Sequence, residues 1–320
     1  MGKKRSNKMI EFMRFISCVF VCFIHCPFPA PAGRYVTMIG RYAVPFFILL
    51  SGYFSYNANP IAKAKKKLVE TLQIVLVGGI VCLIWNSINS YLEFHDFTKW
   101  FQQYLKVETI LKLLLFNRAV FLNSVFYYFF LMIYTYFIFI IACKTNTVKY
   151  FYFLIPFLLL MLFIVATKGK WFMGGNWLFL GLPMFFLGHF LHSHPQIITS
   201  TKGKEYLLII TGVMLTLVEN SLKIHTDYIY LGSIVMAVAC LCLCINRGQD
   251  SCPSIFATIG TNYSLYIMIL HCEVRDTLRI FISNQSYYFP VLVLCVTVFL
   301  SALAKMVIDS IRTKKVRFAF

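Results

Sequence analysis

Residues 10–28 read IEFMRFISCVFVCFIHCPF, an apolar run that contains the ionisable residues Arg14 and His25. A run of this length is sufficient for a helix to cross the hydrocarbon core of a membrane. An ionisable side chain is costly in that environment, so its presence there indicates a functional role. The stretch therefore predicts a membrane protein and points to a candidate functional site in its first helix.

Arg14 and His25 are predicted to lie on one face of this helix. They are eleven residues apart, which corresponds to about three turns plus 20° and to about 16 Å along the axis. Arg14 is then near the cytoplasmic side and His25 near the middle or the outer side. We expect both side chains to face one shared, water-accessible cavity. The alternative is that Arg14 extends to the inner head groups and that His25 caps a helix end near Pro27.

The rest of the chain predicts an all-α bundle of about ten transmembrane helices. The composition is 59% hydrophobic and only 13% charged, whereas a soluble domain has about 25% charged residues. The alternating pattern of a transmembrane barrel is absent. We expect a single domain over residues 1–320 without a separate soluble domain. The predicted spans are 10–28, 37–57, 68–91, 122–143, 150–167, 175–192, 206–221, 228–246, 256–273 and 287–309.

The basic residues predict the orientation of the bundle. With a cytoplasmic N-terminus, 17 of the 30 lysines and arginines fall in cytoplasmic segments and 10 in outer segments. This excess follows the positive-inside rule, so both termini are expected in the cytoplasm. Because these residues flank apolar runs and meet lipid head groups, the net charge of +18 does not indicate nucleic-acid binding. Glu11 and Arg14 interrupt the first apolar run, which favours an uncleaved helix over a signal peptide.

The cysteines predict neither a disulfide framework nor a metal site. Most of the eleven lie inside apolar runs, and none forms a C-x-x-C pair, so we expect reduced thiols that pack as small apolar residues. Cys22, His25 and Cys26 have the side chains of metal ligands. No fourth ligand can be identified, and a metal is therefore not predicted.

The second span combines an arginine with residues that shape a helix. Pro45 removes a backbone hydrogen bond and is expected to kink the helix. Ser51 and Gly52 allow close helix approach. Arg41, on the outer half, is expected to neutralise an anion or a developing negative charge, unless its side chain only extends to the interface.

The longest outer segment, 92–121, is expected to contain a short helix at the membrane interface. Phe97, Trp100 and Tyr104 are interspersed there with lysine and glutamate, a mixture typical of rings at the level of the head groups. No internal or inverted repeat is visible, so the common transporter architecture has no support.

Three motifs make the chain similar to the acyltransferase-3 family of bacterial membrane O-acyltransferases. The first is Arg-x10-His in the opening span. The second is a run like R-x-x-x-P-x-F followed by S-G in the next span. The third is a late span of the form G-x3-S-x-Y-x4-H. The residues that carry them are Arg14 and His25; Arg41, Pro45, Phe47, Ser51 and Gly52; and Gly260, Ser264, Tyr266 and His271.

The resemblance implies an activity. Members of the family move an acyl group, often acetyl, from cytoplasmic acyl-CoA to a hydroxyl of a cell-envelope glycan or glycolipid, within a ten-helix domain of the bacterial cytoplasmic membrane. By this analogy His25 is the catalytic base and Arg14 helps to hold the acyl donor. Acyl-CoA is then a co-substrate, and no permanently bound cofactor is expected. The expected partners are membrane lipid, acyl-CoA and the glycan or glycolipid acceptor.

The donor-binding residues depart from the family pattern. The family often has Arg-x-x-Arg at the start of the third span, where this chain has Lys65, Lys66 and Lys67. The charge is kept, but the bidentate guanidinium geometry is lost. Together with Lys63 and Arg14, these lysines would form a basic mouth for the phosphates of coenzyme A. The alternative is ordinary positive-inside flanking.

The residue types also agree with acyl transfer. A base is needed near the nucleophile, and histidine serves near neutral pH. Positive or hydrogen-bonding groups are needed at the oxyanion. The candidates for oxyanion or acceptor contacts are Arg41, Ser51, Tyr266 and His271. Glu273 is expected either to orient the ring of His271 or to make a loop contact.

A transporter or flippase of a small polar solute or lipid-linked glycan is the alternative function. Ion-coupled transport usually places carboxylates in mid-membrane. The acids nearest the spans are Glu11, Glu70, Glu219 and Asp309, and each lies towards an end. This counts against ion coupling but not against passive flipping. Glu219 is expected in a solvated turn near His225, with contact to an acceptor sugar as the second possibility.

Overall fold

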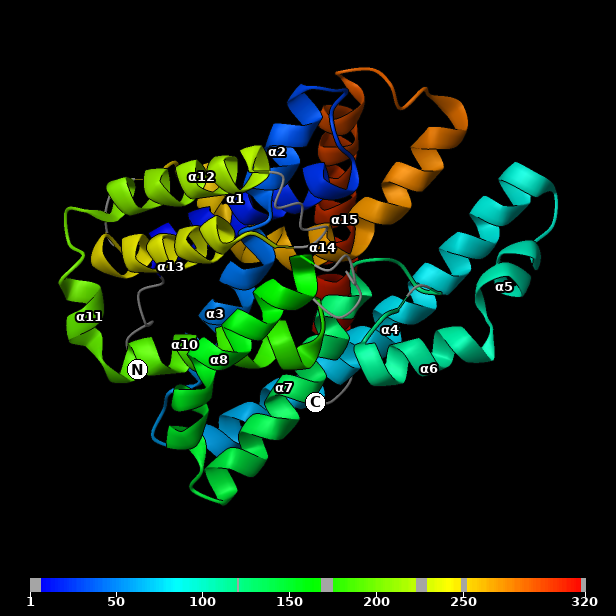
Figure 1. Ribbon diagram of the computed structural model, residues 1–320. Helices are drawn as coiled ribbons and strands as arrows, with labels where there is room; N and C mark the ends of the chain where they lie inside the picture. Colours follow the sequence, from blue (N-terminus) through cyan, green and yellow to red (C-terminus); the bar gives the residue numbers. More distant parts are fainter. Residues whose placement is uncertain (1–6, 120, 168–174, 223–228, 249–251, 318–320) are drawn as a thin grey trace.

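The computed structural model describes residues 7–119, 121–167, 175–222, 229–248 and 252–317, and each regular element in these ranges is helical (Figure 1). In chain order the helices are α1 (Lys8–His25), α2 (Ala32–Gly40), α3 (Ala43–Ser55), α4 (Pro60–Phe94), α5 (Lys99–Tyr104), α6 (Val107–Phe116), α7 (Phe126–Lys144), α8 (Val148–Thr167), the π-helical segment η1 (Trp177–Gly181), α10 (Leu182–Ser193), α11 (Pro195–Thr199), α12 (Glu205–Ser221), α13 (Leu231–Asn246), α14 (Ser254–Phe281) and α15 (Phe289–Arg317).

The all-helical fold class is confirmed, and the chain is a multi-pass membrane protein. Each of the ten predicted spans overlaps one helix or two consecutive helical segments. Within the described part of the chain, six helical stretches are long and apolar enough to cross a membrane. They are Ala32–Ser55, Pro60–Phe94, Phe126–Lys144, Val148–Val165, Ser254–Phe281 and Phe289–Ser310. η1 with α10, and α13, are shorter apolar helices.

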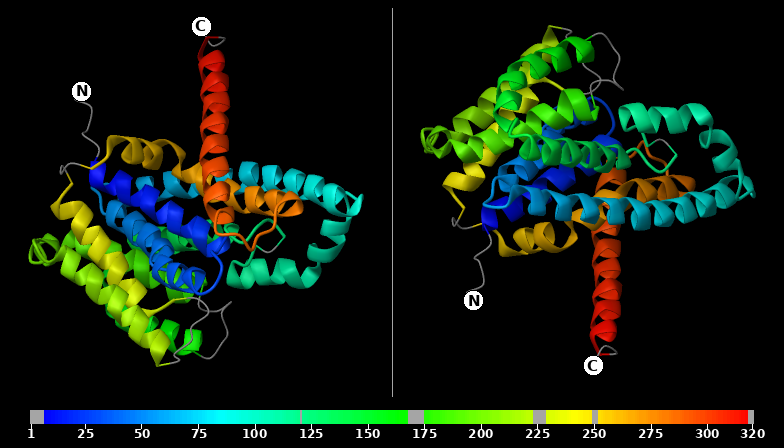
Figure 2. Two further views of the ribbon diagram at one scale, coloured as in Figure 1. Left: turned by 90° about the horizontal axis from the view of Figure 1, so that it is seen from above. Right: turned by 90° about the horizontal axis from the view of Figure 1, so that it is seen from below.

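The lipid-facing surface can be recognised from large apolar side chains that remain exposed. Leu76 on α4, Phe153 on α8 and Met306 on α15 are 65%, 79% and 66% exposed. Apolar surface of this extent indicates contact with lipid rather than with water. Figure 2 shows α15 standing out from the rest of the bundle, which explains why so much of its apolar side chain area is uncovered.

The third span is longer than the sequence predicted, because α4 has 35 residues and starts at Pro60 instead of residue 68. The Asn59 side chain caps its first turn by accepting a hydrogen bond from the Ala62 amide at 3.1 Å. Pro60 occupies the first helical position, where its missing amide proton costs nothing. The lysines of residues 63–67 therefore lie on the helix and not in a loop.

The far end of α4 projects from the bundle. A helix of 35 residues is about 52 Å long, whereas the hydrocarbon core is about 30 Å thick. The chain reverses at His95, a left-handed residue with φ 55°. α5 and α6 then turn back towards the bundle, and the three helices form the projecting corner visible in both views of Figure 2. The short helix expected in 92–121 is thus a pair of short helices.

The second span is broken at Arg41, as the proline predicted. α2 ends at Gly40 and α3 begins at Ala43, which places Pro45 in the first turn of α3. Pro45 has no amide proton to donate to the carbonyl of Arg41, four residues earlier. The break therefore sets Arg41 at the junction of two helix axes.

Close helix contacts hold the remaining elements together. α1 packs against α14, α3 against α10, α4 against α7, and α12 against α13. A Cβ atom at Gly52 would overlap the carbonyl oxygen of Phe185 in α10, and one at Gly260 would overlap that of Glu11 in α1. The expectation of close approach at Gly52 is confirmed. The first half of α1 contributes to one apolar core and its second half to another, so α1 joins the two parts of the bundle.

Candidate active site

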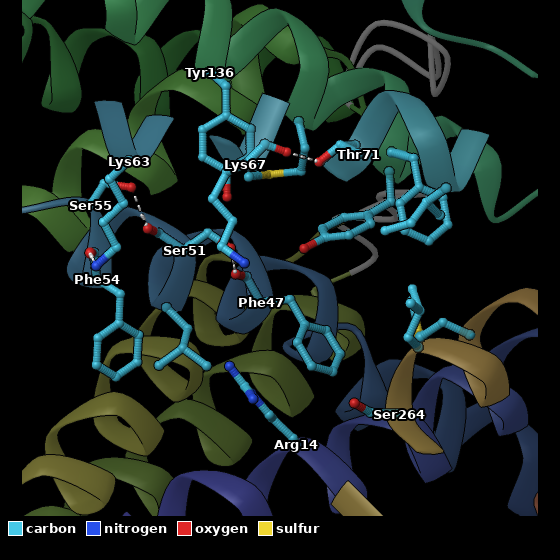
Figure 3. A pocket seen from close by; sticks show the side chains of 17 residues that line it. Arg14, Phe47, Ser51, Phe54, Ser55, Lys63, Lys67, Thr71, Tyr136 and Ser264 are labelled. Atoms are coloured by element: carbon cyan, nitrogen blue, oxygen red, sulfur yellow. Dashed lines mark hydrogen bonds between the residues drawn. The ribbon is translucent and has the colours of Figure 1, made fainter. Parts of the chain in front are cut away.

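A cavity of about 310 Å³, called here the Arg14 cavity, lies between α1, α3, α4, α7 and α14. Three cations line it, namely Arg14 from α1 and Lys63 and Lys67 from α4. Figure 3 shows Arg14 and Lys67 extending into the same space from opposite sides. No aspartate or glutamate is among the described residues that line the cavity. The arrangement creates a positive potential that suits an anionic ligand.

The cations of this cavity are held by neighbours outside it. Arg14 lies 3.2 Å from the carboxylate of Glu11, and Lys67 lies 2.7 Å from that of Glu70. Both are partly exposed pairs on a single helix, which contribute little to stability but hold the side chains in place.

Of the four lysines predicted to form the basic mouth, Lys63 and Lys67 reach the cavity. Lys65 and Lys66 are exposed on α4 and do not line it. The helical start of α4 explains the difference, because Lys63 and Lys67 are four residues apart and therefore share one face. The lysine run divides into two residues at the cavity and two on the outer surface of α4.

The walls of the Arg14 cavity are mostly aromatic and aliphatic. Phe47 and Tyr128 are among these residues, with ring centroids 6.5 Å apart in an edge-to-face arrangement. Ser51 also lines the cavity, and its hydroxyl donates to the carbonyl of Phe47 at 2.9 Å. The predicted residue Ser51 is therefore on the Arg14 side and not beside His25.

A second cavity of about 620 Å³, called here the His25 cavity, lies at the other end of α1. His25, Arg41, Arg118, Arg275 and Asp276 line it, together with apolar and aromatic side chains. The two predicted residues His25 and Arg41 are thus brought together, although they come from different helices. The break in the second span places Arg41 at this cavity.

Ser124 and Arg275 fix the position of His25. The Ser124 hydroxyl lies 3.2 Å from Nδ1 of His25, within hydrogen-bond distance. Nη1 of Arg275 donates to the carbonyl of His25 at 2.9 Å, which satisfies an acceptor at the end of α1. Asp276 in turn accepts two hydrogen bonds from Arg275, both at 2.8 Å. This bidentate pair orients the guanidinium.

His271 is buried beside His25, with ring centroids 5.3 Å apart. Its Nδ1 lies 2.8 Å from the carbonyl of Ile267, so Nδ1 carries the proton that is donated. Nε2 is then the unprotonated nitrogen. Nε2 is buried and has no hydrogen-bond partner among the described residues.

Glu273 does not orient His271, which corrects the sequence-based expectation. Side chains two residues apart on a helix point in directions that differ by about 200°. The buried carboxylate of Glu273 accepts a hydrogen bond from Nδ2 of Asn123 at 2.8 Å. Asn123 precedes Ser124, so this contact anchors the segment that carries the Ser124 hydroxyl.

The segment 99–119, called here the hood, covers the His25 cavity with aromatic rings. Trp100 and Tyr104 of α5 have ring centroids 5.3 Å apart, and both line the cavity. Asn117 ties the hood to the chain before η1, because its side chain donates to the carbonyl of Gly175 and accepts from the amide of Trp177. Burial lowers the pKa of Arg118, but an arginine remains charged at neutral pH.

The expectation of one cavity shared by Arg14 and His25 is wrong, because each lines a different cavity. The two cavities adjoin along α3 and α7. On α3, Pro45 lines the His25 cavity and Phe47 the Arg14 cavity; on α7, Tyr127 lines the His25 cavity and Tyr128 the Arg14 cavity. The two positions on each helix lie within one helical turn of each other, which is about 5.4 Å along the helix axis. Both helices therefore contribute side chains to the walls of the two cavities.

Two further predicted residues do not reach the site. Tyr266 is half-buried and lines neither cavity. Glu219 is buried instead of lying in a solvated turn, and its carboxylate accepts from the amides of Leu231 and Gly232, both at 2.9 Å. It caps the start of α13. His225 lies outside the described residues.

Several residues of the site were missed by the sequence analysis. Arg275 and Asp276 were placed in a loop because the ninth span was ended at residue 273, whereas α14 continues to Phe281. Their position one turn beyond His271 was the signal that would have identified them. Ser124 carries no comparable signal, since a single serine at the start of a span is ordinary.

Cysteine and histidine do not form a metal site in the part of the chain that is described. None of the eleven cysteines forms a disulfide. No group of three or more histidine, cysteine, aspartate or glutamate side chains among the described residues is arranged to hold a metal ion.

The chain matches a known family model over almost its whole length. The model, described as an acyltransferase domain and belonging to the acyltransferase-3 family, matches residues 7–308. This segment contains every residue that lines the two cavities. No curated protein and no solved structure matches the chain.

Proposed function

The chain belongs to the acyltransferase-3 family, and from this premise we propose that it moves an acyl group, acetyl in the simplest case, from acyl-CoA to a hydroxyl of a cell-envelope glycan or glycolipid. The family makes it an enzyme of the O-acyltransferase type. The observation that carries the proposal is the placement of His25 in one cavity and a cluster of cations in the adjoining cavity.

In the proposed orientation, ten helices span the bacterial cytoplasmic membrane and both termini are cytoplasmic. The excess of basic residues in the segments assigned to the cytoplasm supports this orientation. It places the Arg14 cavity, with Lys63 and Lys67, towards the cytoplasm. The His25 cavity and the hood then face the outside, where envelope glycans are available.

The Arg14 cavity receives the acyl donor in this proposal. Coenzyme A carries several phosphate charges, for which Arg14, Lys63 and Lys67 supply positive partners. The long, thin pantetheine arm follows the apolar wall towards Phe47 and Tyr128. Acyl-CoA binds as a co-substrate and leaves as free coenzyme A.

In this proposal the acyl group passes between Phe47 of α3 and Tyr128 of α7. The two rings meet edge to face, and both helices also line the His25 cavity. Rotation of one ring opens a path for the arm, and side-chain rotations of this kind are fast compared with catalysis. The thioester carbonyl then reaches the acceptor hydroxyl beside His25.

The chemistry is a single transfer with His25 as the base. With Nδ1–H of His25 donated to Ser124, Nε2 takes the proton of the acceptor hydroxyl. The hydroxyl oxygen attacks the thioester carbonyl, and the negative charge that develops on the carbonyl oxygen is stabilised by Arg41. The C–S bond breaks, and His25 returns the proton to the thiolate of coenzyme A. An acyl-histidine intermediate is the alternative route.

The three remaining predicted contact residues differ in their proposed roles. Ser51 lies on the Arg14 side and is proposed to contact the donor rather than the acceptor. His271 lines neither cavity, so its buried Nε2 is proposed to bind an ordered water that in turn reaches the acceptor. No contact with a substrate is proposed for Tyr266.

Thioester consumption tests the proposal and separates it from the transporter alternative. Purified protein in lipid is incubated with acetyl-CoA labelled in the acetyl group. We expect label to leave coenzyme A for an acceptor or for water, and the His25→Ala variant to abolish this loss. His194→Ala serves as a control, because His194 lines neither cavity. Label that stays on coenzyme A across a broad acceptor panel contradicts the proposal and favours a flippase.

A further inference from the structure

Of lysine and arginine, the described residues that line the cavities around His25 include only arginine. Two smaller cavities adjoin the His25 cavity, and they contribute Arg34 and Arg279. The chain has ten arginines and twenty lysines. Five of the ten arginines line these three cavities, whereas no lysine is among the described residues that line them. The Arg14 cavity, in contrast, contains one arginine and two lysines.

The charge of the His25 cavity is strongly positive. Among the described residues that line it are three guanidiniums and one carboxylate, that of Asp276, which gives these residues a net charge of +2. Asp276 forms its two hydrogen bonds with Arg275. Arg41 also packs over the ring of Tyr230, with its central carbon 5.1 Å from the ring centroid. Low-dielectric walls increase the effect of such charges on a bound anion.

Membrane orientation does not explain these arginines. The positive-inside rule places basic residues in the cytoplasmic segments, and this cavity faces outside in the proposed orientation. The acyl donor does not explain them either, because its phosphates have partners in the Arg14 cavity. A single oxyanion requires only one of the three guanidiniums.

We propose that the acceptor carries a phosphate group, which the arginines of the His25 cavity bind while His25 acts on a nearby hydroxyl. Guanidinium binds phosphate oxygens in a bidentate manner, which explains arginine in place of lysine. A phosphate monoester or a pyrophosphate also matches the charge of +2 better than a single carboxylate does. The rings of Trp100 and Tyr104 provide an apolar surface for the adjoining sugar or lipid chain. This inference rests on the proposed function.

The test measures binding without any acyl donor. Full-length protein in nanodiscs of zwitterionic lipid is titrated with two pairs of probes. The lipid pair is farnesyl phosphate and farnesol, and the water-soluble pair is glucose 1-phosphate and glucose. We expect the phosphorylated member of at least one pair to bind, with an affinity that falls as the salt concentration rises. Binding of farnesyl phosphate alone indicates a lipid-linked acceptor, and binding of glucose 1-phosphate alone indicates a phosphorylated glycan.

Variants in the hood test whether the phosphorylated probe is bound by arginine. Arg118→Gln is expected to weaken binding of the phosphorylated probe about tenfold, and Arg118→Lys to weaken it less because the charge remains. Lys112→Gln is the matched control, since Lys112 lies on the same hood, pairs with Glu108 and does not line the cavity. Thermal unfolding without a probe verifies that each variant is folded.

Equal binding of the phosphorylated and neutral probes, or equal affinities for Arg118→Gln and Lys112→Gln, would overturn the inference. Because no donor is present, the result is independent of acyl transfer. Phosphate binding without thioester consumption would refute the proposed function and leave this site in place. Thioester consumption without phosphate binding would refute the phosphate site and leave the proposed function in place.

Discussion

At the scale of single residues, the role of His25 as a base depends on the groups that hold its ring. Ser124 is 3.2 Å from Nδ1, and the Ser124 hydroxyl also lies 3.6 Å from the sulfur of Cys272. An imidazole whose Nδ1–H is donated presents a basic Nε2, and the partner of Nδ1 thereby selects the tautomer. Ser124 is in this respect a positioning residue, since it acts through His25 and not on the substrate.

Replacing Ser124 tests this role. We expect Ser124→Ala to lower kcat about tenfold, less than the loss of the base itself, and to leave the KM for acyl-CoA unchanged. Ser124→Thr keeps the hydroxyl and should restore most of the rate. Initial rates of thioester consumption provide the measurement. An unchanged kcat in Ser124→Ala would show that the 3.2 Å contact does not orient the base.

The lysine run provides a matched pair of variants for donor binding. Lys67 lines the Arg14 cavity and Lys66, its neighbour in sequence, does not. We expect Lys67→Gln to raise the KM for acyl-CoA severalfold, because a charge near the donor phosphates is lost. Lys66→Gln should leave this KM within about twofold, since an exposed charge is screened. Equal effects of the two variants would contradict the assignment of the Arg14 cavity to the donor.

At the scale of helices, two glycines allow the crossing of α3 and α10, and this crossing places Ser51 and Phe47 at the Arg14 cavity. Gly52 approaches the carbonyl of Phe185, and Gly188 of α10 approaches that of Leu49. Any larger side chain at either position must move the helices apart.

A larger residue at Gly52 should therefore reduce stability. We expect Gly52→Val to destabilise the folded protein by about 1–3 kcal/mol or more, the usual cost of overpacking, and to lower its Tm. Gly79→Ala is the control, because a Cβ atom there would make ordinary contacts with Leu122 at 3.6 Å. Thermal unfolding of the purified variants measures the difference. A Tm for Gly52→Val equal to that of Gly79→Ala would refute the close crossing.

Local patterns in the sequence predicted the structural features that lie within a single helix. The hydrophobic runs located the helices, Pro45 predicted the break at Arg41, and the eleven-residue spacing placed Arg14 and His25 on a common face of α1. The sequence could not predict that these two residues would line different cavities, because the cavity walls come from several helices.

Contacts between distant residues were beyond prediction for the same reason. The hydrogen bond between Asn123 and Glu273 joins residues 150 positions apart, and that between Arg275 and the carbonyl of His25 joins residues 250 apart. Neither has a signature in local periodicity or spacing. The length of α4 was also missed, because the lysines of its first turns resemble a loop in hydropathy although Asn59 and Pro60 mark the helix start.

At the scale of the whole molecule, the proposal requires the two cavities to face opposite sides of the membrane. Lys66 on α4 and Gln103 on α5 are both exposed, and they lie at opposite ends of the projecting helix and its return. We expect Lys66→Cys to react with a membrane-impermeant maleimide only after the membrane is opened, and Gln103→Cys to react in intact cells. Subtraction of the wild-type signal accounts for the native thiols. Labelling of both positions from the same side would contradict the orientation.

The most direct test of the transfer itself is the mass of the envelope glycans and glycolipids from three strains. One strain carries the wild-type protein, one lacks it, and one carries His25→Ala at equal abundance. We expect wild-type material to be heavier by one acyl group per modified unit, and the material from the other two strains to be identical to each other. A glycan and glycolipid pool whose mass is the same in all three strains would contradict acyl transfer by this protein.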